Sequence, residues 1–431
     1  MIRIVKLGEM PKEEILKREL PTVKAEKTVS EILRNVREKG DEALYAYTEK
    51  YDGVSLSSLT VSEEEIRDAV KKVGPEFMDL LNRAADNIRL FHEKQLRSGF
   101  FFTKENGVVL GQRVVPVDRA GVYVPGGTAP LCSTVLMDVI PAKIAGCPEV
   151  IVATPPGKDG KVAPAVLAAA SVAGADRVFK VGGAQAIAAM AYGTETVPRT
   201  DKIVGPGNAY VAEAKRQVYG AVSVDMIAGP SEILVISDGG SDPRVLAADL
   251  LSQAEHDVNA SAVLITDCPS LAEETAKEIE RQLPLLSREK IARASVEQNG
   301  KIIITGSLEE ALDLSNELAP EHLELAVDDP FSLLGKVRHA GSVFLGRHTP
   351  EALGDYLAGP NHTLPTGGTA RFSSPLSVDD FVKKIQVTSF PAAALDSVRQ
   401  DVADFAMAEG LTGHARSALI RGELSRKEGN P

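Results

Sequence analysis

Gln253 and His256 are the first residues whose types and spacing could do chemistry, within the sequence SQAEHD and a predicted helix over Pro243–His256. Side chains three residues apart on a helix share one face. An imidazole and an amide oxygen on that face could bind one metal ion, although glutamine is an uncommon zinc ligand. Taken alone, the segment is more typical of an exposed helix end with a polar cluster.

Glu321 and His322 form a second candidate, between Pro320 and a predicted strand over Leu323–Val327. A histidine is a natural general base near neutral pH, and a nearby carboxylate can activate water. On a turn both side chains could face one cleft, whereas on an extended segment they would diverge. A charged pair at the start of a surface strand is the simpler interpretation of this segment alone.

Two further segments each hold an acid and an imidazole. Asp355 and His362 belong to a loop rich in Gly and Pro, where the acid could bind a metal ion and the histidine could be a ligand or hydrogen-bond the loop. Glu409 and His414 lie in a predicted helical tail, where Gly410 suits a helix C-cap. Each segment by itself is more typical of an ordinary loop or helix end.

Two glycine-rich turns could receive a phosphate or a ribose. Val204–Asn208 (VGPGN) and Val181–Gln185 (VGGAQ) each follow a predicted strand and open a predicted helix. Such turns direct backbone N–H groups at one point. Neither contains the GxGxxG fingerprint of dinucleotide-binding units, so ordinary turn chemistry is the simpler explanation of each.

The elements that must position these residues alternate from about residue 112 onward. Short β-rich runs end in Gly or Pro turns and are followed by Ala-rich helical stretches, which is typical of a parallel α/β layer. A second, similar set follows a strand over Ser231–Ser237. Two α/β units of about equal size favour a site in the crevice between them. Helical patterns precede residue 100 and follow about residue 375.

Composition and charge exclude several classes of protein. The chain has 431 residues, 44 % hydrophobic and 25 % charged, which suits several globular domains rather than a disordered chain. A net charge of −12, with no Trp, disfavours nucleic acid and anionic membranes as partners. The N-terminus lacks a signal-peptide pattern, and Cys132, Cys147 and Cys268 are too scattered for a disulfide framework. We therefore expect a cytoplasmic protein.

Nine long segments between about residues 115 and 420 resemble, in order, those of the histidinol dehydrogenase family, the zinc-dependent enzymes that end histidine biosynthesis. The segments are GVYVPGGTAPLCSTVLM, VGGAQAIAAMAYGTE, DKIVGPGNAYVAEAKRQV, AGPSEILVI, DLLSQAEHD, APEHLEL, AGSVFLG, GDYLAGPNHTLPT and EGLTGHARS. A run of matches this long and ordered is more specific than any short motif. The N-terminal hundred residues fit in length and helical character.

The resemblance assigns roles position by position. It matches Gln253, His256, Asp355 and His414 to the ligands of one zinc ion per subunit. It matches Tyr123, Gln185 and Asn208 to positions that bind NAD, and Glu321 and His322 to the catalytic pair. The substrate-binding positions that it implies are Ser231, Gln253, His256, His322, Asp355, Glu409 and His414.

The resemblance also implies a fold and an assembly. The fold is two incomplete Rossmann-like α/β units, akin to aldehyde dehydrogenases, in a homodimer whose tail residues Glu409 and His414 complete the neighbouring site. The expected regions are a mainly helical region over 1–111 that packs on the second α/β unit, a first α/β unit on the NAD side over 112–236, a second with the metal and catalytic residues over 237–375, and a helical, dimer-exchanging tail over 376–431.

The implied reaction is the four-electron oxidation of L-histidinol, through bound L-histidinal, to L-histidine with two NAD. Zinc would hold the imidazole and amine of the substrate, His322 would take the hydroxyl proton, and Glu321 would activate water. A thiohemiacetal on a cysteine is the weaker route, because none of the three cysteines has an adjacent base in the sequence.

Three alternatives stay open on the residues alone. The first is a related zinc and NAD dehydrogenase that oxidises another small polar alcohol. The second is a zinc hydrolase, because a metal ion with a Glu-His pair could equally activate water against an ester or amide. The third is a binding protein without catalysis, for which a crevice between two domains suffices.

Overall fold

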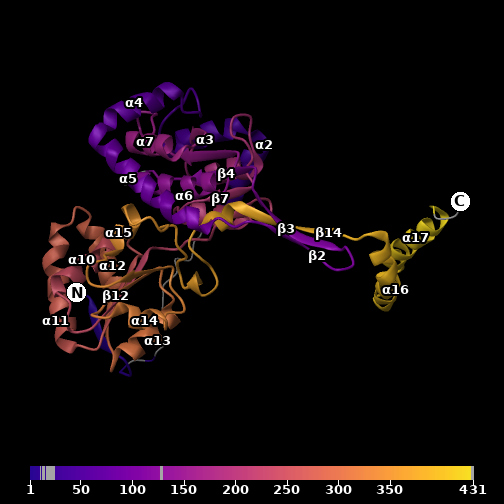
Figure 1. Cartoon of the computed structure of the whole chain (residues 1–431). Helices are drawn as coiled ribbons and strands as arrows, with labels where there is room; N and C mark the ends of the chain where they lie inside the picture. The colour runs from indigo at the N-terminus through magenta and orange to yellow at the C-terminus, as the bar shows by residue number, and fades with distance from the viewer. Residues whose placement is uncertain (10, 12–14, 16–24, 127–129, 429–431) are drawn as a thin grey trace. The chain divides into compact units, whose positions relative to one another are not determined.

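The chain forms two compact units (Figure 1). Unit 1 comprises Met1–Leu96 and Val117–Phe381, and unit 2 comprises Arg97–Pro116 and Val382–Pro431. The computed structural model describes residues 1–9, 11, 15, 25–126 and 130–428. Residues 127–129, part of the first family-like segment, lie outside the described residues.

The first sheet of unit 1 is entirely parallel, with the strand order β6-β5-β4-β7-β8. Its strands are β4 (Arg119–Tyr123), β5 (Glu149–Thr154), β6 (Arg177–Lys180), β7 (Lys202–Val204) and β8 (Ser223–Val224), and its helices are α6 (Cys132–Ile144), α7 (Pro164–Ala173), α8 (Gly183–Tyr192) and α9 (Ala209–Val218). Val150 and Val152 of β5 pack with α6 and α7, whereas Ile151 and Ala153 pack with α8 and α9. Alternate residues of a strand point to opposite faces, so both faces of this sheet are covered.

The second sheet of unit 1 is also parallel, with the order β1-β11-β10-β9-β12-β13. Its strands are β1 (Arg3–Lys6), β9 (Glu232–Ser237), β10 (Ser261–Thr266), β11 (Lys301–Ile304), β12 (His322–Ala326) and β13 (Ser342–Leu345). Its helices are α10 (Pro243–Ala254), α11 (Pro269–Gln282), α12 (Glu289–Gln298), α13 (Leu308–Leu318), α14 (Pro330–Leu334) and α15 (Glu351–Tyr356). Short 3₁₀ turns are η1 (Glu93–Gln95), η2 (Leu283–Leu285), η3 (Thr369–Arg371) and η4 (Val378–Phe381). Two parallel α/β layers confirm the predicted fold class.

The N-terminal helices pack against the first α/β layer, which corrects the expectation that region 1–111 packs on the second. These helices are α2 (Glu26–Lys39), α3 (Asp41–Asp52), α4 (Glu63–Val73) and α5 (Pro75–His92). Val29 of α2 and Leu44 of α3 share a core with Phe179 of β6, while Ala69 and Ile88 share one with α6 and α7. Their apolar stripes face these Ala-rich helices. From the described part of residues 1–25, β1 pairs with the second sheet, and Ile2 and Ile15 pack in the cores of that layer.

Unit 2 contains an antiparallel sheet and a helical hairpin. The sheet has the order β14-β3-β2, from β2 (Phe100–Thr103), β3 (Val109–Pro116) and β14 (Val382–Ser389). The hairpin is α16 (Ala392–Ala408) and α17 (Thr412–Glu428), with Gly410 between them at a φ of +76°. The tail expected to be helical from residue 376 therefore begins with a 3₁₀ turn and a strand. Among the described helices, none combines the length and the apolar character needed to cross a membrane.

Candidate active site

The candidate catalytic residues lie where the strands of the second sheet begin. Glu321 immediately precedes β12, and His322 is its first residue, opposite Ile233 of β9. Ser231 is half-buried immediately before β9. The helix that follows a parallel strand runs back across the sheet, so Gln253 in the last turn of α10 returns to this same edge.

His322 is buried, and its two ring nitrogens meet different groups. Nδ1 lies 2.9 Å from the carbonyl oxygen of Glu232, which can only accept a hydrogen bond, so Nδ1 carries the proton. Nε2 lies 3.6 Å from Oε1 of Glu351 and has no hydrogen-bond partner among the described residues. Burial lowers the pKa of His322 to about 4, against the opposing charge of Asp355. The imidazole is therefore neutral near pH 7, with a free lone pair on Nε2.

Glu321 faces the same strand edge as His322. Its Oε2 accepts a hydrogen bond from the backbone N–H of Glu232 at 2.8 Å and lies 3.5 Å from Nδ1 of His322. Burial raises the pKa of Glu321 well above its ordinary value, despite that hydrogen bond. The two side chains do not diverge, because Glu321 lies before the strand. Ala319, two residues earlier, is the only non-glycine residue with a positive φ among those described, at +48°.

Asp355 of α15 stands among three histidines. Its Oδ1 lies 3.4 Å from Nδ1 of His362. Burial would raise the pKa of Asp355, but the contact with His362 and the charges of His322 and His256 hold it at about 2. Burial lowers the pKa of His362, yet its contact with Asp355 outweighs this and raises it overall. Asp355 is therefore ionised, with the imidazole of His362 beside it.

The donor atoms around Asp355 fit a metal ion. One atom each from His322, Glu351 and Asp355 lie within 4.8 Å of one another. Nε2 of His322, Oε1 of Glu351 and both amide atoms of Gln253 are buried without a regular hydrogen bond. Unpaired buried polar atoms are costly, and a cation would pair the imidazole nitrogen, the carboxylate oxygen and the amide oxygen, although not the amide NH2 group. The mixed nitrogen and oxygen donors are compatible with zinc.

The predicted ligands are only partly brought together. Gln253 is 1 % exposed and close enough to Glu351 to lower the pKa of that acid, which burial raises to about 8. α10 ends at Ala254 rather than at His256, because Asp257 hydrogen-bonds the N–H of Asn259 and starts a turn. His256 stays near Asp355: burial lowers the pKa of His256, and the charge of Asp355 opposes this.

Glu409 and His414 belong to unit 2. Glu409 caps the end of α16, and His414 lies in the first turn of α17. Both side chains are exposed. Neither is part of the cluster of donors in the described residues of unit 1.

Sequence reasoning left Glu351 out of the site and gave His362 no firm role. Glu351 precedes Asp355 by four residues, a spacing that places two helical side chains on one face, so this signal was present in the sequence. Nε2 of His362 lies 3.2 Å from Oγ1 of Thr134 on α6. Only the fold brings α6 to that loop, so no spacing could have indicated this contact.

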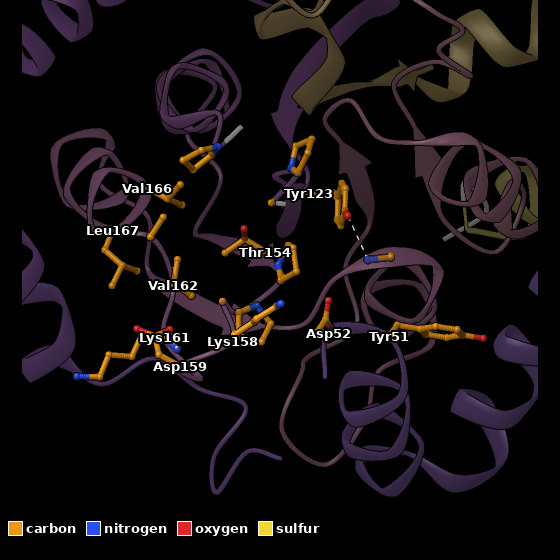
Figure 2. A pocket seen from close by; sticks show the side chains of 18 of the residues that line it. Tyr51, Asp52, Tyr123, Thr154, Lys158, Asp159, Lys161, Val162, Val166 and Leu167 are labelled. Atoms are coloured by element: carbon orange, nitrogen blue, oxygen red, sulfur yellow. Dashed lines mark hydrogen bonds between the residues drawn. The ribbon is translucent and has the colours of Figure 1, made fainter. Parts of the chain in front are cut away.

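A separate cavity of about 1090 Å³ opens at the carboxyl edge of the first sheet (Figure 2). Tyr123 ends β4, Gln185 lies in the first turn of α8, and Asn208 caps α9, so all three predicted NAD-binding residues line this cavity. In the strand order, β5 and β7 flank β4, which is the switch point where open parallel sheets bind ligands. No residue of the His322 cluster lines the cavity.

The turns around the cavity are fixed by short-range bonds. Oη of Tyr123 accepts the backbone N–H of Gly183 at 3.1 Å, and burial raises the pKa of this phenol to about 12 (Figure 2). Oδ1 of Asn208 accepts the N–H groups of Tyr210 at 3.0 Å and Val211 at 3.1 Å. Gly205 has a φ of +110°, and a Cβ there would stand 2.1 Å from the carbonyl oxygen of Tyr123. Only glycine fits this position.

The chain is similar to known proteins along nearly its whole length. The model of the family described as histidinol dehydrogenase matches residues 16–422. A histidinol dehydrogenase from Bacillus cereus (strain ATCC 10987 / NRS 248) is 56 % identical over 398 residues, 92 % of each chain. One from Syntrophotalea carbinolica is 55 % identical over 405 residues, 94 % of each chain.

The fold agrees with these sequences. The crystal structure of histidinol dehydrogenase from Elizabethkingia anophelis superimposes with a TM-score of 0.93 at 37 % identity, covering 99 % of both chains. The chain belongs to the histidinol dehydrogenase family, the zinc-using, NAD-dependent oxidoreductases of the final step of histidine biosynthesis.

Proposed function

We propose that this chain oxidises L-histidinol, through bound L-histidinal, to L-histidine with two NAD, and that His322 and Glu321 are its catalytic residues. The observation that carries the proposal is the neutral, buried imidazole of His322, with Nδ1–H held by a carbonyl group and Nε2 free. A base of this kind can accept a proton at a defined atom.

His322 acts in both oxidation steps. Its Nε2 accepts the hydroxyl proton of the alcohol while a hydride leaves the carbinol carbon for NAD. Glu321, whose pKa burial raises, takes a proton from the water that adds to the aldehyde. As water adds, the protonated Nε2 gives its proton to the aldehyde oxygen, so that Nε2 is free again to accept a proton of the resulting hydrate while the second hydride leaves for a fresh NAD. The buried site keeps the aldehyde from solvent between the two steps.

For the metal site, we propose Gln253, His256 and Asp355, with the partner subunit's His414, as the zinc ligands. Support comes from the unpaired Gln253 amide and from the ionised Asp355 near His256. Bound there, zinc supplies Lewis-acid contacts to the imidazole and amine of the substrate. Ser231, His322 and the partner subunit's Glu409 complete the proposed substrate contacts.

The cofactor subsite is proposed to be the cavity lined by Tyr123, Gln185 and Asn208. Its volume of about 1090 Å³ exceeds what most drug-sized ligands fill and suits a dinucleotide. Gln185 lies in the first turn of α8, and Asn208 immediately precedes α9. The N-terminus of each helix favours a phosphate group.

A homodimer is proposed for the assembly. Large apolar side chains are exposed on unit 2, including Phe100, Phe101, Phe102 and Phe405. A surface of this kind is typical of an interface. The cytoplasm is proposed as the compartment, supported by three free cysteines.

The test is NADH formation from L-histidinol and NAD by zinc-loaded protein. Two NADH per histidinol, lost when a chelator removes zinc, supports the four-electron reaction. One NADH per histidinol would mean that the aldehyde is released, and would remove the role of Glu321. No NADH from folded, zinc-bound protein would contradict the proposal.

A further inference from the structure

Asp52 lines the cofactor cavity, and among the described residues no hydrogen-bond partner accounts for its carboxyl group there. It is the last residue of α3, and one oxygen of its carboxyl group is buried with no hydrogen-bond partner. The side chain points towards the hydroxyl end of Tyr123 (Figure 2). The charge of Asp52 also contributes to the raised pKa of Tyr123, so the two groups are close.

Three features make an ionised acid unfavourable at this position. Burial alone raises the pKa of Asp52 to about 6. In the described part of the chain no cation offsets that effect, although Lys158 and Lys161 line the same cavity. Asp52 also ends its helix, where the backbone carbonyl groups already carry partial negative charge. An acidic residue that lowers the stability of the folded protein and faces a ligand cavity is typical of a ligand-binding residue.

A carboxylate in a dinucleotide cavity accepts hydrogen bonds and repels negative charge. NAD already carries two phosphates, and its hydrogen-bond donors are the ribose hydroxyl groups, the adenine amino group and the nicotinamide carboxamide. Of these, only a ribose hydroxyl group is replaced by a phosphate in NADP. An acid that accepts from ribose hydroxyl groups, and thereby excludes a ribose phosphate, is the common solution in dinucleotide-binding units. The GxGxxG turn of those units is absent here, so the acid comes from α3 rather than from the strand after that turn.

We infer that Asp52 is a specificity-determining residue of the cofactor cavity, which accepts a hydrogen bond from a ribose hydroxyl group of NAD and excludes the additional phosphate of NADP. The inference rests on the proposal that this cavity binds NAD. Asp52 is then the residue that selects NAD over NADP.

The experiment compares kcat and KM for NAD and for NADP in Asp52→Asn, with L-histidinol saturating. Loss of a hydrogen bond to a charged group raises KM for NAD by about tenfold or more, with kcat nearly unchanged. The ratio of kcat/KM for NAD over NADP falls by a similar or larger factor. Asp159→Asn is the matched control: Asp159 lines the same cavity, but its Oδ1 already accepts the N–H of Lys161 at 3.1 Å.

A stability measurement separates binding from structure. Asp52→Asn raises Tm without ligand, because the substitution removes an unpaired acid, whereas loss of a structural contact would lower Tm. Gln185→Ala tests the cavity itself. An unchanged NAD/NADP ratio in Asp52→Asn, with KM for NAD raised in Gln185→Ala, overturns the inference alone. An unchanged KM in both variants overturns the assignment of the cavity as well.

Discussion

Nζ of Lys215 lies 2.6 Å from Oδ1 of Asp225, and the two side chains are only 3 % and 1 % exposed. The other oxygen of Asp225 accepts the backbone N–H of Gly205 at 2.8 Å, and Lys215 also donates to the carbonyl oxygen of Gly205 at 2.5 Å. This buried ion pair therefore holds the turn that leads to Asn208 and the cofactor cavity.

Lys215→Met is expected to destabilise the fold by about 3–5 kcal/mol, because it leaves the carboxylate of Asp225 buried and unpaired. The double variant Lys215→Met/Asp225→Asn should recover part of the loss. Chemical denaturation measures both. Lys336→Met breaks the exposed pair with Glu309 and is the control, with an expected change within about 1 kcal/mol. Equal effects of the two single variants would show that burial of the pair is unimportant.

His322→Asn is expected to lower kcat by about 10²–10⁴-fold and to leave one zinc per subunit, because the proposed role of Nε2 is that of a base. Kinetics and metal analysis of the purified variant check this. A ring nitrogen of His322 is also among the donor atoms that lie within 4.8 Å of one another, and Nε2 lies 3.6 Å from Oε1 of Glu351. Loss of zinc together with activity would therefore make His322 a ligand and rule out the base.

His256→Ala should weaken zinc binding by more than about 100-fold, beyond the usual effect of groups that only support a ligand. Competition with a chromophoric chelator gives the affinity. His348→Ala, at an exposed position outside the site, is the control and should bind zinc as the unmodified chain does. Unchanged zinc affinity in His256→Ala would remove this residue from the ligand set.

Asp138 should make stability fall as the pH rises. Burial raises the pKa of Asp138 to about 7, although its hydrogen bond from Thr363 and the charges of His362 and Lys215 oppose this. The folded state thus holds a proton that the unfolded chain releases near pH 4, and stability decreases from about pH 4 to pH 7. Asp138→Asn should flatten that decrease, by at most on the order of 4 kcal/mol. Denaturant titrations at several pH values measure this decrease. Parallel curves of unfolding free energy against pH for the unmodified chain and for Asp138→Asn would contradict the expectation.

The proposed exchange of tails predicts complementation between two inactive variants. Homodimers of His322→Asn and of His414→Ala should each be nearly inactive. In a mixed dimer one site carries both substitutions and the other carries neither. An equal mixture, unfolded together and refolded, should therefore recover about a quarter of the original activity. No recovery from a mixture that forms mixed dimers would place His414 in the site of its own subunit.

Local patterns predicted the α/β layers well, because β5 and the helices around it combine a short apolar strand, a turn and an Ala-rich helix. β1 and β14 were not expected. β1 has only four residues, and β14 has mostly exposed side chains, so what defines each as a strand is its distant partner. The packing of α2–α5 on the first layer depends in the same way on long-range contacts.

The residues of the site divide in the same way, into those that the sequence indicates and those that only the fold brings together. The resemblance supplied Tyr123, Gln185 and Asn208, and the fold brings all three to one cavity. Spacing could not place Asp355 beside His322, since they lie on α15 and β12 and meet only through tertiary packing. Glu351 was within reach of sequence reasoning, and Asp52 was not, because its role depends on where α3 ends.

The pairing of β1 with β11, which sets Arg3 opposite Lys301, has a consequence for the order of assembly. During synthesis the first strand emerges long before its partner, while the helices that follow it can already pack on the first sheet as that sheet is made. Closing so long a loop is slow, so docking of the N-terminal strand is expected to be among the last steps of folding. Until then the edge of β11 is unpaired, and an unpaired edge strand invites aggregation. Late in folding, β1 thus covers the open edge of the sheet that carries the catalytic pair.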